Sequence, residues 1–149
     1  NISFNLLPEL APETVRSFVK LVNDGFYGGT LFHRVIPGFM IQGGDPNTKD
    51  PNMKSQWGMG GPSFKVKGEF SSRSHLRGIV SMARSTDPDS AGSQFFIVTK
   101  DSTFLDREYT VFGEVIEGMD VADKIVSLDR DRNDCPLKDA KMLKVSISE

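Results

Sequence analysis

Two segments of the chain combine amide and apolar side chains in a way that could bind a ligand. Residues 32–45 read FHRVIPGFMIQGGD and contain Arg34 and Gln42, and residues 92–98 read GSQFFIV and contain Gln94. A guanidinium presents five donors in a rigid fork, and each amide can both donate and accept. With large apolar neighbours, this set suits a ligand that is half apolar ring and half peptide backbone.

Strand alternation decides which of these side chains can act together. In a strand, residues two apart share a face. Met40 therefore points with Gln42, and Phe96 points with Gln94, whereas Phe95 faces the opposite side and is expected in the core. Each segment thus offers an amide and a large apolar side chain to the same side.

The usual signatures of hydrolytic, metal and nucleotide chemistry are missing from the sequence. It contains no GxSxG, P-loop, HExxH or CxxC pattern. The two histidines, His33 and His75, and the single Cys135 are too few for a convincing metal site. Residues 129–140 begin like a calcium loop but place Asp134 and Ala140 where Gly and Glu are needed. We therefore expect no metal and no cofactor, and we interpret His33 as a buried structural residue, His75 as a loop residue and Cys135 as inert.

Composition predicts a single soluble domain over residues 1–149. The chain is 38% hydrophobic and 26% charged, with 18 Lys and Arg against 20 Asp and Glu. The charges are interspersed, which argues against nucleic-acid binding, and no apolar run is long enough to span a membrane. No signal peptide opens the sequence, and one cysteine excludes an intrachain disulfide. These features predict a cytoplasmic monomer.

Two helices are predicted from apolar periodicity. Val15, Phe18, Val19 and Val22 fall on one helical face, and Pro12 suits the first turn of that helix. Gly25 is placed to end it in the left-handed conformation. A second helix is expected around residues 121–126, with Asp120 as its N-cap; its apolar positions are Val121, Ala122, Ile125 and Val126.

Short strand-like runs make up most of the remaining chain. Asn1–Leu7 alternates in hydrophobicity, and further runs are bounded by Gly, Pro, Asp or Ser: Leu31–Ile36, Met40–Gln42, Phe64–Val66, Ile79–Ala83, Phe95–Thr99, Val111–Val115 and Leu143–Ile147. Many short strands and two helices favour an antiparallel barrel or sandwich. Residues 45–61 form a long irregular stretch, which is typical of a functional loop.

The two segments closely resemble the signature motifs of the cyclophilins, the cyclosporin-type peptidyl-prolyl cis-trans isomerases. The resemblance covers nearly the whole chain, includes residues 58–61, 78–83 and 111–113, and is closest in style to bacterial single-domain members. It implies a mainly β fold, a closed eight-stranded antiparallel β-barrel capped by two α-helices. Relative to that fold, the sequence begins at the second strand, so the first strand is expected to be missing.

The resemblance also implies the site. Arg34 takes the place of the catalytic arginine, which would stabilise the twisted amide without covalent chemistry. The proline pocket corresponds to Phe39, Met40, Phe96 and Leu105, and the polar groups beside it to Gln42 and Gln94. The backbone of Ala83 and Arg84 corresponds to the segment that pairs with substrate. Proline-containing peptides and unfolded proteins are the expected partners, and the expected role is assistance of protein folding.

Three positions depart from the pattern of many family members. Arg84 stands in place of Asn, Phe104 in place of a Trp at the groove rim, and Tyr109 in place of His. The Arg84 change is expected to be tolerated because that contact runs through the main chain. The loss of an indole donor predicts reduced affinity for cyclosporin-type cyclic peptides. Two rival functions stay open: a module that binds proline-containing segments without turnover, and an interaction domain of a larger assembly.

Overall fold

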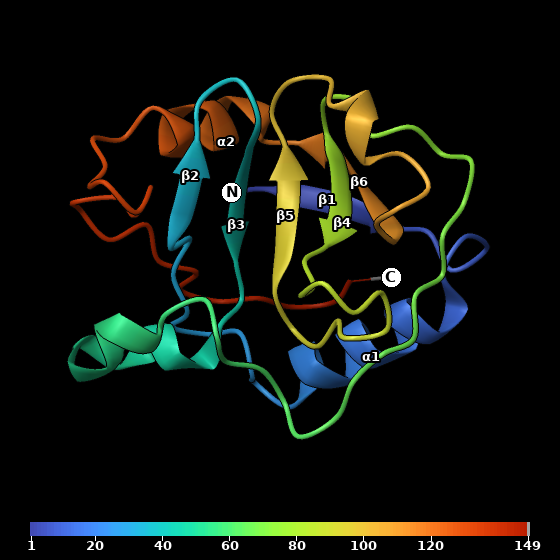
Figure 1. Cartoon of the computed structure of the whole chain (residues 1–149), viewed down its shortest axis with the longest axis horizontal. Coiled ribbons are helices and arrows are strands. Elements are labelled where there is room, and N and C mark those ends of the chain that lie inside the picture. Colours follow the sequence, from blue (N-terminus) through green and yellow to red (C-terminus); the bar gives the residue numbers. More distant parts are fainter. Residues whose placement is uncertain (149) are drawn as a thin grey trace.

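The computed structural model describes residues 1–148 and shows one antiparallel sheet with a helix at either end (Figure 1). The strands are β1 (Ser3–Leu6), β2 (Arg34–Ile36), β3 (Met40–Gly43), β4 (Ile79–Met82), β5 (Phe95–Val98) and β6 (Val111–Glu117). The α-helices are α1 (Pro12–Asn23) and α2 (Met119–Val126), and three short 3-10 helices are η1 (Pro46–Lys49), η2 (Pro51–Gln56) and η3 (Thr103–Leu105). None of the helices in this part of the chain is both long and apolar enough to cross a membrane.

Helix α1 forms as the periodicity predicts. Val15, Phe18 and Val22 are buried on its inner face, and Pro12 occupies its first turn. Its free N-terminal amides are satisfied from a distant loop, because Glu69 accepts hydrogen bonds from the backbone N–H of Thr14 (2.7 Å) and Glu13 (3.2 Å). Gly25 follows the helix with φ of +74°, which confirms its predicted role as a left-handed terminator.

Helix α2 begins differently from the prediction. Gly118, not Asp120, is its N-cap, and Asp120 lies in the first turn. Gly118 has φ of +98°, and a Cβ atom there would collide with the backbone of Asn1 and Ile2. Only glycine fits this close approach. The N-cap position is therefore occupied by Gly118, which has no side chain to cap the helix.

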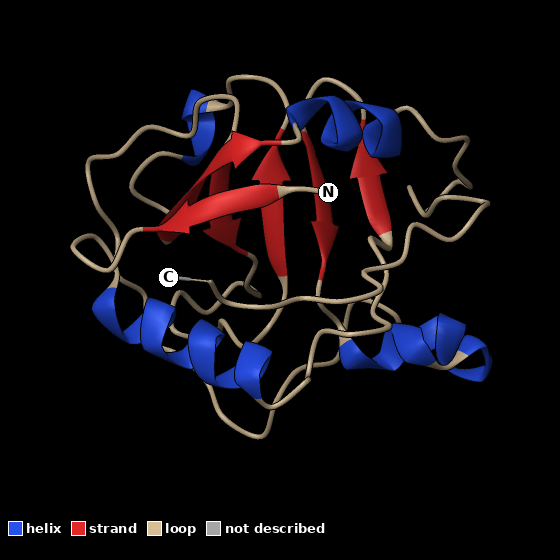
Figure 2. Ribbon diagram, turned by 180° about the vertical axis from the view of Figure 1, so that it is seen from behind, coloured by secondary structure: helices blue, strands red, loops and turns tan. Residues whose placement is uncertain are grey.

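The sheet has six strands in the order β1-β6-β4-β5-β3-β2 and is not closed, so the expected eight-stranded closed barrel is not confirmed. It curls strongly, and Figure 2 shows β1, beside the N mark, crossing in front of the other strands. Two predicted strands are absent from the described chain. Val66 makes only an isolated bridge with Ala91, and residues 143–147 form no strand, with Leu143 84% exposed.

Residues 140–142 pair with the backbone of the segment that precedes β2, without forming a strand. The backbone N–H of Phe32 donates to Ala140 (2.9 Å), and that of Met142 donates to Thr30 (2.8 Å). Ala140 and Met142 also pack against the core, and this segment runs across the molecule toward the C mark in Figure 2. The core is therefore covered on this side by paired backbone of irregular shape.

The sheet separates two apolar clusters, as strand alternation requires. Phe95 and Ile97 of β5 belong to the main core, whereas Phe96 and Val98 belong to a smaller cluster on the opposite face. Six phenylalanines lie in the main core, fully or partly buried: Phe4, Phe18, Phe26, Phe32, Phe95 and Phe112. Phe112 is fully buried and meets Phe4 and Phe95 edge-on. The predicted division of β5 into a core side and an outer side is thus confirmed.

Candidate active site

A groove of about 440 Å³ lies on the face of the sheet that carries the smaller apolar cluster. The lining residues are Arg34, Phe39, Met40, Gln42, Ala83, Arg84, Phe96, Phe104, Leu105, Glu108 and Tyr109. Every residue predicted for the site is among them except Gln94, and Glu108 is an addition. The groove therefore gathers side chains from β2, β3, β5, the end of β4 and η3.

The strand register aligns the main groups of the groove. Arg34 on β2 lies opposite Gln42 on β3, and Gln42 lies opposite Phe96 on β5. Side chains directly opposite each other in neighbouring strands point to the same face and approach closely. A cation, an amide and an aromatic ring thus stand in one row across three strands.

The apolar end of the groove is formed by buried side chains with an exposed rim. Met40 is 1% exposed and Phe96 is 4% exposed, and both pack in one cluster with Leu105. At the rim, the ring of Phe104 is 69% exposed and packs against Phe39 with a centroid distance of 5.4 Å. This end can hold a small apolar ring, because its floor is already dehydrated and its rim supplies aromatic faces.

A chain of hydrogen bonds positions the polar end. The Nη1 of Arg34 donates to Oε1 of Gln42 (3.3 Å), and Nε2 of Gln42 donates to Oε1 of Gln94 (3.0 Å). Nε2 of Gln94 in turn donates to the carbonyls of Gly58 (2.9 Å) and Gly60 (3.0 Å). Gln94 therefore lies behind the groove wall and orients Gln42 rather than lining the groove.

Asp45 anchors the loop that ends this chain of hydrogen bonds. Asp45 was not identified as a functional residue from the sequence. Its fully buried carboxylate accepts hydrogen bonds from the backbone N–H of Asn47 (2.8 Å), Gly58 (2.5 Å) and Gly60 (3.2 Å). A Cβ atom at Gly60 would collide with this carboxylate, so glycine is required there. The only sequence signal was its place at the start of the irregular stretch of residues 45–61.

His75 lies outside the helices and strands, as predicted for a loop residue, but the prediction did not foresee its burial. Its side chain is fully buried beneath the groove, where Nδ1 lies 3.1 Å from Oδ1 of Asp106 and Nε2 lies 2.9 Å from Oγ of Ser81. Burial lowers the pKa of His75, although the Asp106 carboxylate acts in the opposite direction. Burial acts to raise the pKa of Asp106, but hydrogen bonds from Ser74 and His75 outweigh it and the pKa is lowered. The imidazole is therefore held neutral below the site.

The other candidate chemical groups lie outside the groove. His33 is buried, as predicted, and burial lowers its pKa. Cys135 is buried as well, and burial raises the pKa of its thiol, which makes the thiolate scarce. Within residues 1–148, no group of three or more His, Cys, Asp or Glu side chains is arranged to hold a metal ion.

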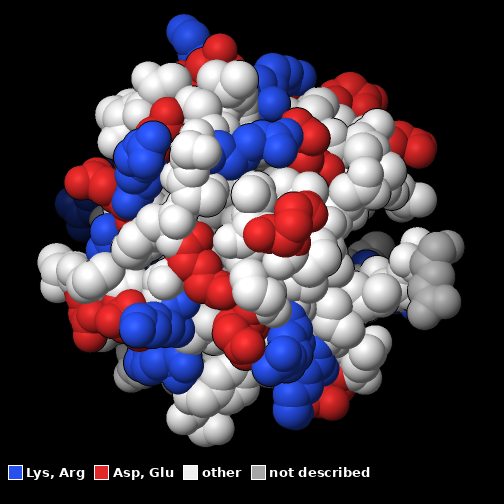
Figure 3. Space-filling model, turned by 90° about the vertical axis from the view of Figure 1, so that its right-hand side faces the viewer, with Lys and Arg blue, Asp and Glu red and all other residues white. Residues whose placement is uncertain are grey.

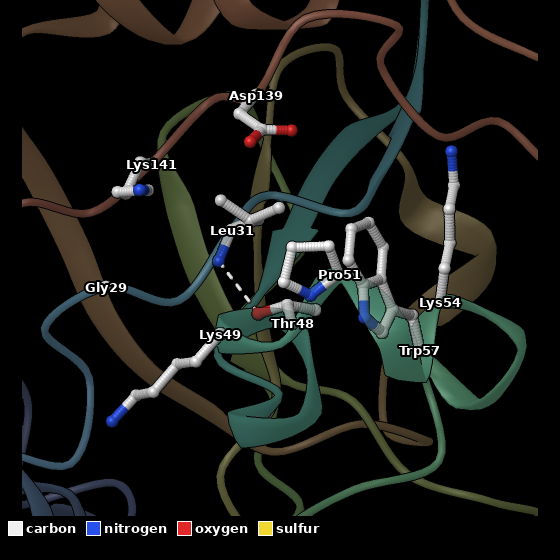
Figure 4. Close-up of a pocket in the computed structure, with 9 residues that line it drawn as sticks. All are labelled: Gly29, Leu31, Thr48, Lys49, Pro51, Lys54, Trp57, Asp139 and Lys141. Atoms are coloured by element: carbon white, nitrogen blue, oxygen red, sulfur yellow. Dashed lines mark hydrogen bonds between the residues drawn. The ribbon is translucent and has the colours of Figure 1, made fainter.

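A second cavity, of about 230 Å³, shares no residue with the groove (Figure 4). Leu31, Pro51 and Trp57 form its apolar part, and the side chains of Lys49 and Lys54 extend away from each other at its margins. Inside this cavity, the N–H of Leu31 donates to Oγ1 of Thr48 (2.9 Å), so this backbone N–H already has a hydrogen-bond partner. The row of cation, amide and aromatic ring makes the groove the stronger candidate.

Comparisons with known proteins agree with one another. The family model described as "Cyclophilin type peptidyl-prolyl cis-trans isomerase/CLD" matches residues 1–147. A probable peptidyl-prolyl cis-trans isomerase of Brucella suis is 43% identical over 99% of this chain and 77% of its own length. Peptidyl-prolyl cis-trans isomerase B of Bacillus subtilis is 46% identical over 81% of this chain and 80% of its own length. A crystal structure of a Cryptosporidium parvum cyclophilin-type isomerase, in the presence of the dipeptide Ala-Pro, superposes with a TM-score of 0.88 at 30% identity, covering 99% of this chain and 92% of that one.

Proposed function

This chain belongs to the cyclophilin-type peptidyl-prolyl cis-trans isomerase family, and we propose that its reaction takes place in the groove with Arg34 as the catalytic residue. The activity of the family is rotation about X-Pro peptide bonds, and this chain is an isomerase of that kind. The observation that carries the assignment is the row of Arg34, Gln42 and Phe96 across β2, β3 and β5.

The reaction asks for electrostatic help and no covalent step. The barrier of about 18–20 kcal/mol comes from the amide resonance that is lost when the bond twists. In the twisted state the prolyl nitrogen becomes pyramidal and carries a lone pair. A guanidinium donor near that nitrogen stabilises the twisted state more than either planar state, which is the requirement for catalysis. Arg34 is exposed and has donors beyond the one given to Gln42.

The remaining groups hold the substrate while the bond turns. We assign the proline ring to the apolar end formed by Met40, Phe96 and Leu105, with Phe39 and Phe104 at the rim. Gln42 lies between this pocket and Arg34, where its amide can bind the peptide backbone. The Ala-Pro dipeptide present with the Cryptosporidium parvum protein supports binding of an X-Pro unit here. Unfolded proteins are the corresponding macromolecular substrates.

The test is an isomerase assay on an X-Pro tetrapeptide. Arg34→Ala should lower kcat/KM by about a hundredfold or more, because removing one preorganised donor of a developing charge costs about that much. Arg34→Lys keeps the charge without the fork and should fall between the two. Arg132→Ala removes an exposed cation outside the groove and serves as the control.

A near-normal rate for Arg34→Ala, with an unchanged circular dichroism spectrum, would remove Arg34 from the mechanism. Wild-type protein that binds the tetrapeptide without turning it over would favour the peptide-binding alternative instead.

A further inference from the structure

We propose that the side chain of Arg84 makes the groove select X-Pro peptides that carry an acidic residue close to the proline. The inference rests on the proposed function, since it concerns the same groove. It adds a role for the side chain to the expectation that arginine is tolerated at this position because the contact with substrate runs through the main chain.

The guanidinium of Arg84 is held in a fixed plane at the groove wall. It lies 4.6 Å from the centroid of the Tyr109 ring, in a cation–π arrangement. Its Nε and Nη2 both donate to the carbonyl of Glu108, at 3.0 and 2.8 Å, and its Nη1 donates to the carbonyl of Ser85 at 2.9 Å. A long side chain held at these points loses little further entropy when it meets a ligand.

None of these partners neutralises the charge. All are backbone carbonyls or an aromatic face, and the ion pairs within residues 1–148 involve neither Arg84 nor Arg34. Glu108 is the one acidic residue among those that line the groove, and it meets Arg84 through its backbone oxygen. The groove therefore presents two guanidinium groups and one carboxylate.

The cation stands one ring away from the proline pocket. Tyr109 meets Phe96 edge-on with a centroid distance of 5.8 Å, and Arg84 covers the Tyr109 ring. A peptide whose proline ring lies against Phe96 therefore brings a neighbouring residue near Arg84. The guanidinium also keeps an N–H on Nη2 beyond the one given to Glu108, and a carboxylate can accept it.

The overall charge of the molecule works against this preference, which makes the preference diagnostic. The chain has a formal net charge of -2, so long-range attraction alone would favour basic peptides. On the face seen in Figure 3, acidic and basic side chains are interspersed without a broad field of one sign. A preference for acidic peptides would thus originate in the groove itself.

The experiment uses sets of X-Pro peptides that differ only by Glu, Gln or Lys at one position, scanned over the two residues on each side of proline. Both kcat/KM and the equilibrium Kd, by NMR titration, are measured. At one position or more, wild type should favour Glu over Lys by about threefold in both quantities. The ratio should shrink at high salt, where exposed charges are screened.

Variants separate the Arg84 charge from other causes. Arg84→Gln should bring the Glu/Lys ratio to about one or below, Arg84→Lys should keep part of it, and Arg132→Gln should leave it at the wild-type value. A wild-type ratio near one at every position overturns the inference, as does a ratio that survives Arg84→Gln. If no peptide is turned over, the proposed function fails, while the Kd ratio still decides the role of Arg84.

Discussion

The imidazole of His75 lies nearly parallel to the phenyl ring of Phe96, with ring centroids 6.1 Å apart and planes inclined by 18°. His75 is fully buried and Phe96 lines the groove, so the floor of the apolar pocket rests on a residue that no substrate can reach. Hydrogen bonds at both ring nitrogens, to Asp106 and Ser81, fix the imidazole plane. Support of this kind from below keeps the pocket in shape without a ligand.

Stability should fall as the pH is lowered through the range in which free histidine titrates. The pKa of His75 and that of His33 are both lowered by burial from 6.5, so below that pH the unfolded chain binds protons that the folded chain does not. The free energy of unfolding therefore rises with pH, by at most about 1.4 kcal/mol per pH unit for each histidine. Urea unfolding at pH 7.5 and pH values down to about 5 measures this slope.

NMR titration of the His75 ring protons gives the direct control for that prediction. A midpoint at or above the ordinary histidine value in the folded protein would contradict it. The carboxylate of Asp106 adds a separate loss of stability only in more acidic solution, because its pKa is lowered from 3.8.

Asp45→Ala should destabilise the protein strongly. The substitution removes a fully buried carboxylate that accepts part-buried hydrogen bonds from the N–H groups of Asn47, Gly58 and Gly60, which costs about 3 kcal/mol. The loop would then no longer hold Gln94, and kcat/KM should fall as well. Chemical denaturation and the tetrapeptide assay measure the two effects.

Asp50→Ala is the matched control for Asp45→Ala. Asp50 caps η2 through the N–H of Asn52 (2.9 Å), as Asp45 caps η1 through Asn47, but Asp50 is exposed. Its loss should cost about 1 kcal/mol. Equal costs for the two variants would show that the hydrogen bonds from Gly58 and Gly60 to Asp45 contribute little.

Phe104→Trp should strengthen binding of cyclosporin. Phe104 is the most exposed aromatic residue at the groove rim, and an indole there would add an N–H donor. One neutral hydrogen bond corresponds to about a three- to tenfold lower Kd. Calorimetric titration measures the change, with Phe64→Trp, an exposed aromatic residue outside the groove, as control. An unchanged Kd for Phe104→Trp would show that the missing indole N–H does not determine the affinity for cyclosporin.

Phe112→Ala should lower the free energy of unfolding by about 3–5 kcal/mol, since the ring is fully buried among Phe4, Phe18 and Phe95. The same substitution at Phe64, which is 37% exposed, should cost much less. Urea midpoints of the two variants provide the comparison. Similar losses would mean that the aromatic cluster is not the centre of the core.

Local patterns in the sequence predicted the parts of the fold that depend on neighbours along the chain. The helical period placed α1, and alternation separated Phe95 from Phe96 on β5. The match to the two family motifs predicted that Arg34 and the other groove residues form one site, although the strand register was not known from the sequence. In contrast, the strands expected at residues 64–66 and 143–147 fail, because pairing needs a partner strand that local hydrophobicity cannot reveal.

The residues that were missed depend on partners far along the chain. His75 is buried by Asp106, Ser81 and Phe96, and Asp45 by a loop more than ten residues away. Nothing in the sequence around either residue distinguishes it from an ordinary loop position. The charge environment of Arg84 likewise depends on Glu108 and Tyr109, which reach it only in the folded chain.

The pairing of Thr30 with Met142, 112 positions apart, sets the order in which the molecule can be completed. During synthesis the first third of the chain leaves the ribosome long before its covering segment does. Until residues 140–142 emerge, the backbone of Thr30 and Phe32 lacks these hydrogen-bond partners, and the apolar side chains that the segment covers face water. Loop closure over such a distance is slow compared with helix formation. An enzyme that acts on X-Pro bonds thus reaches its own native state only after residues 140–142 have been translated.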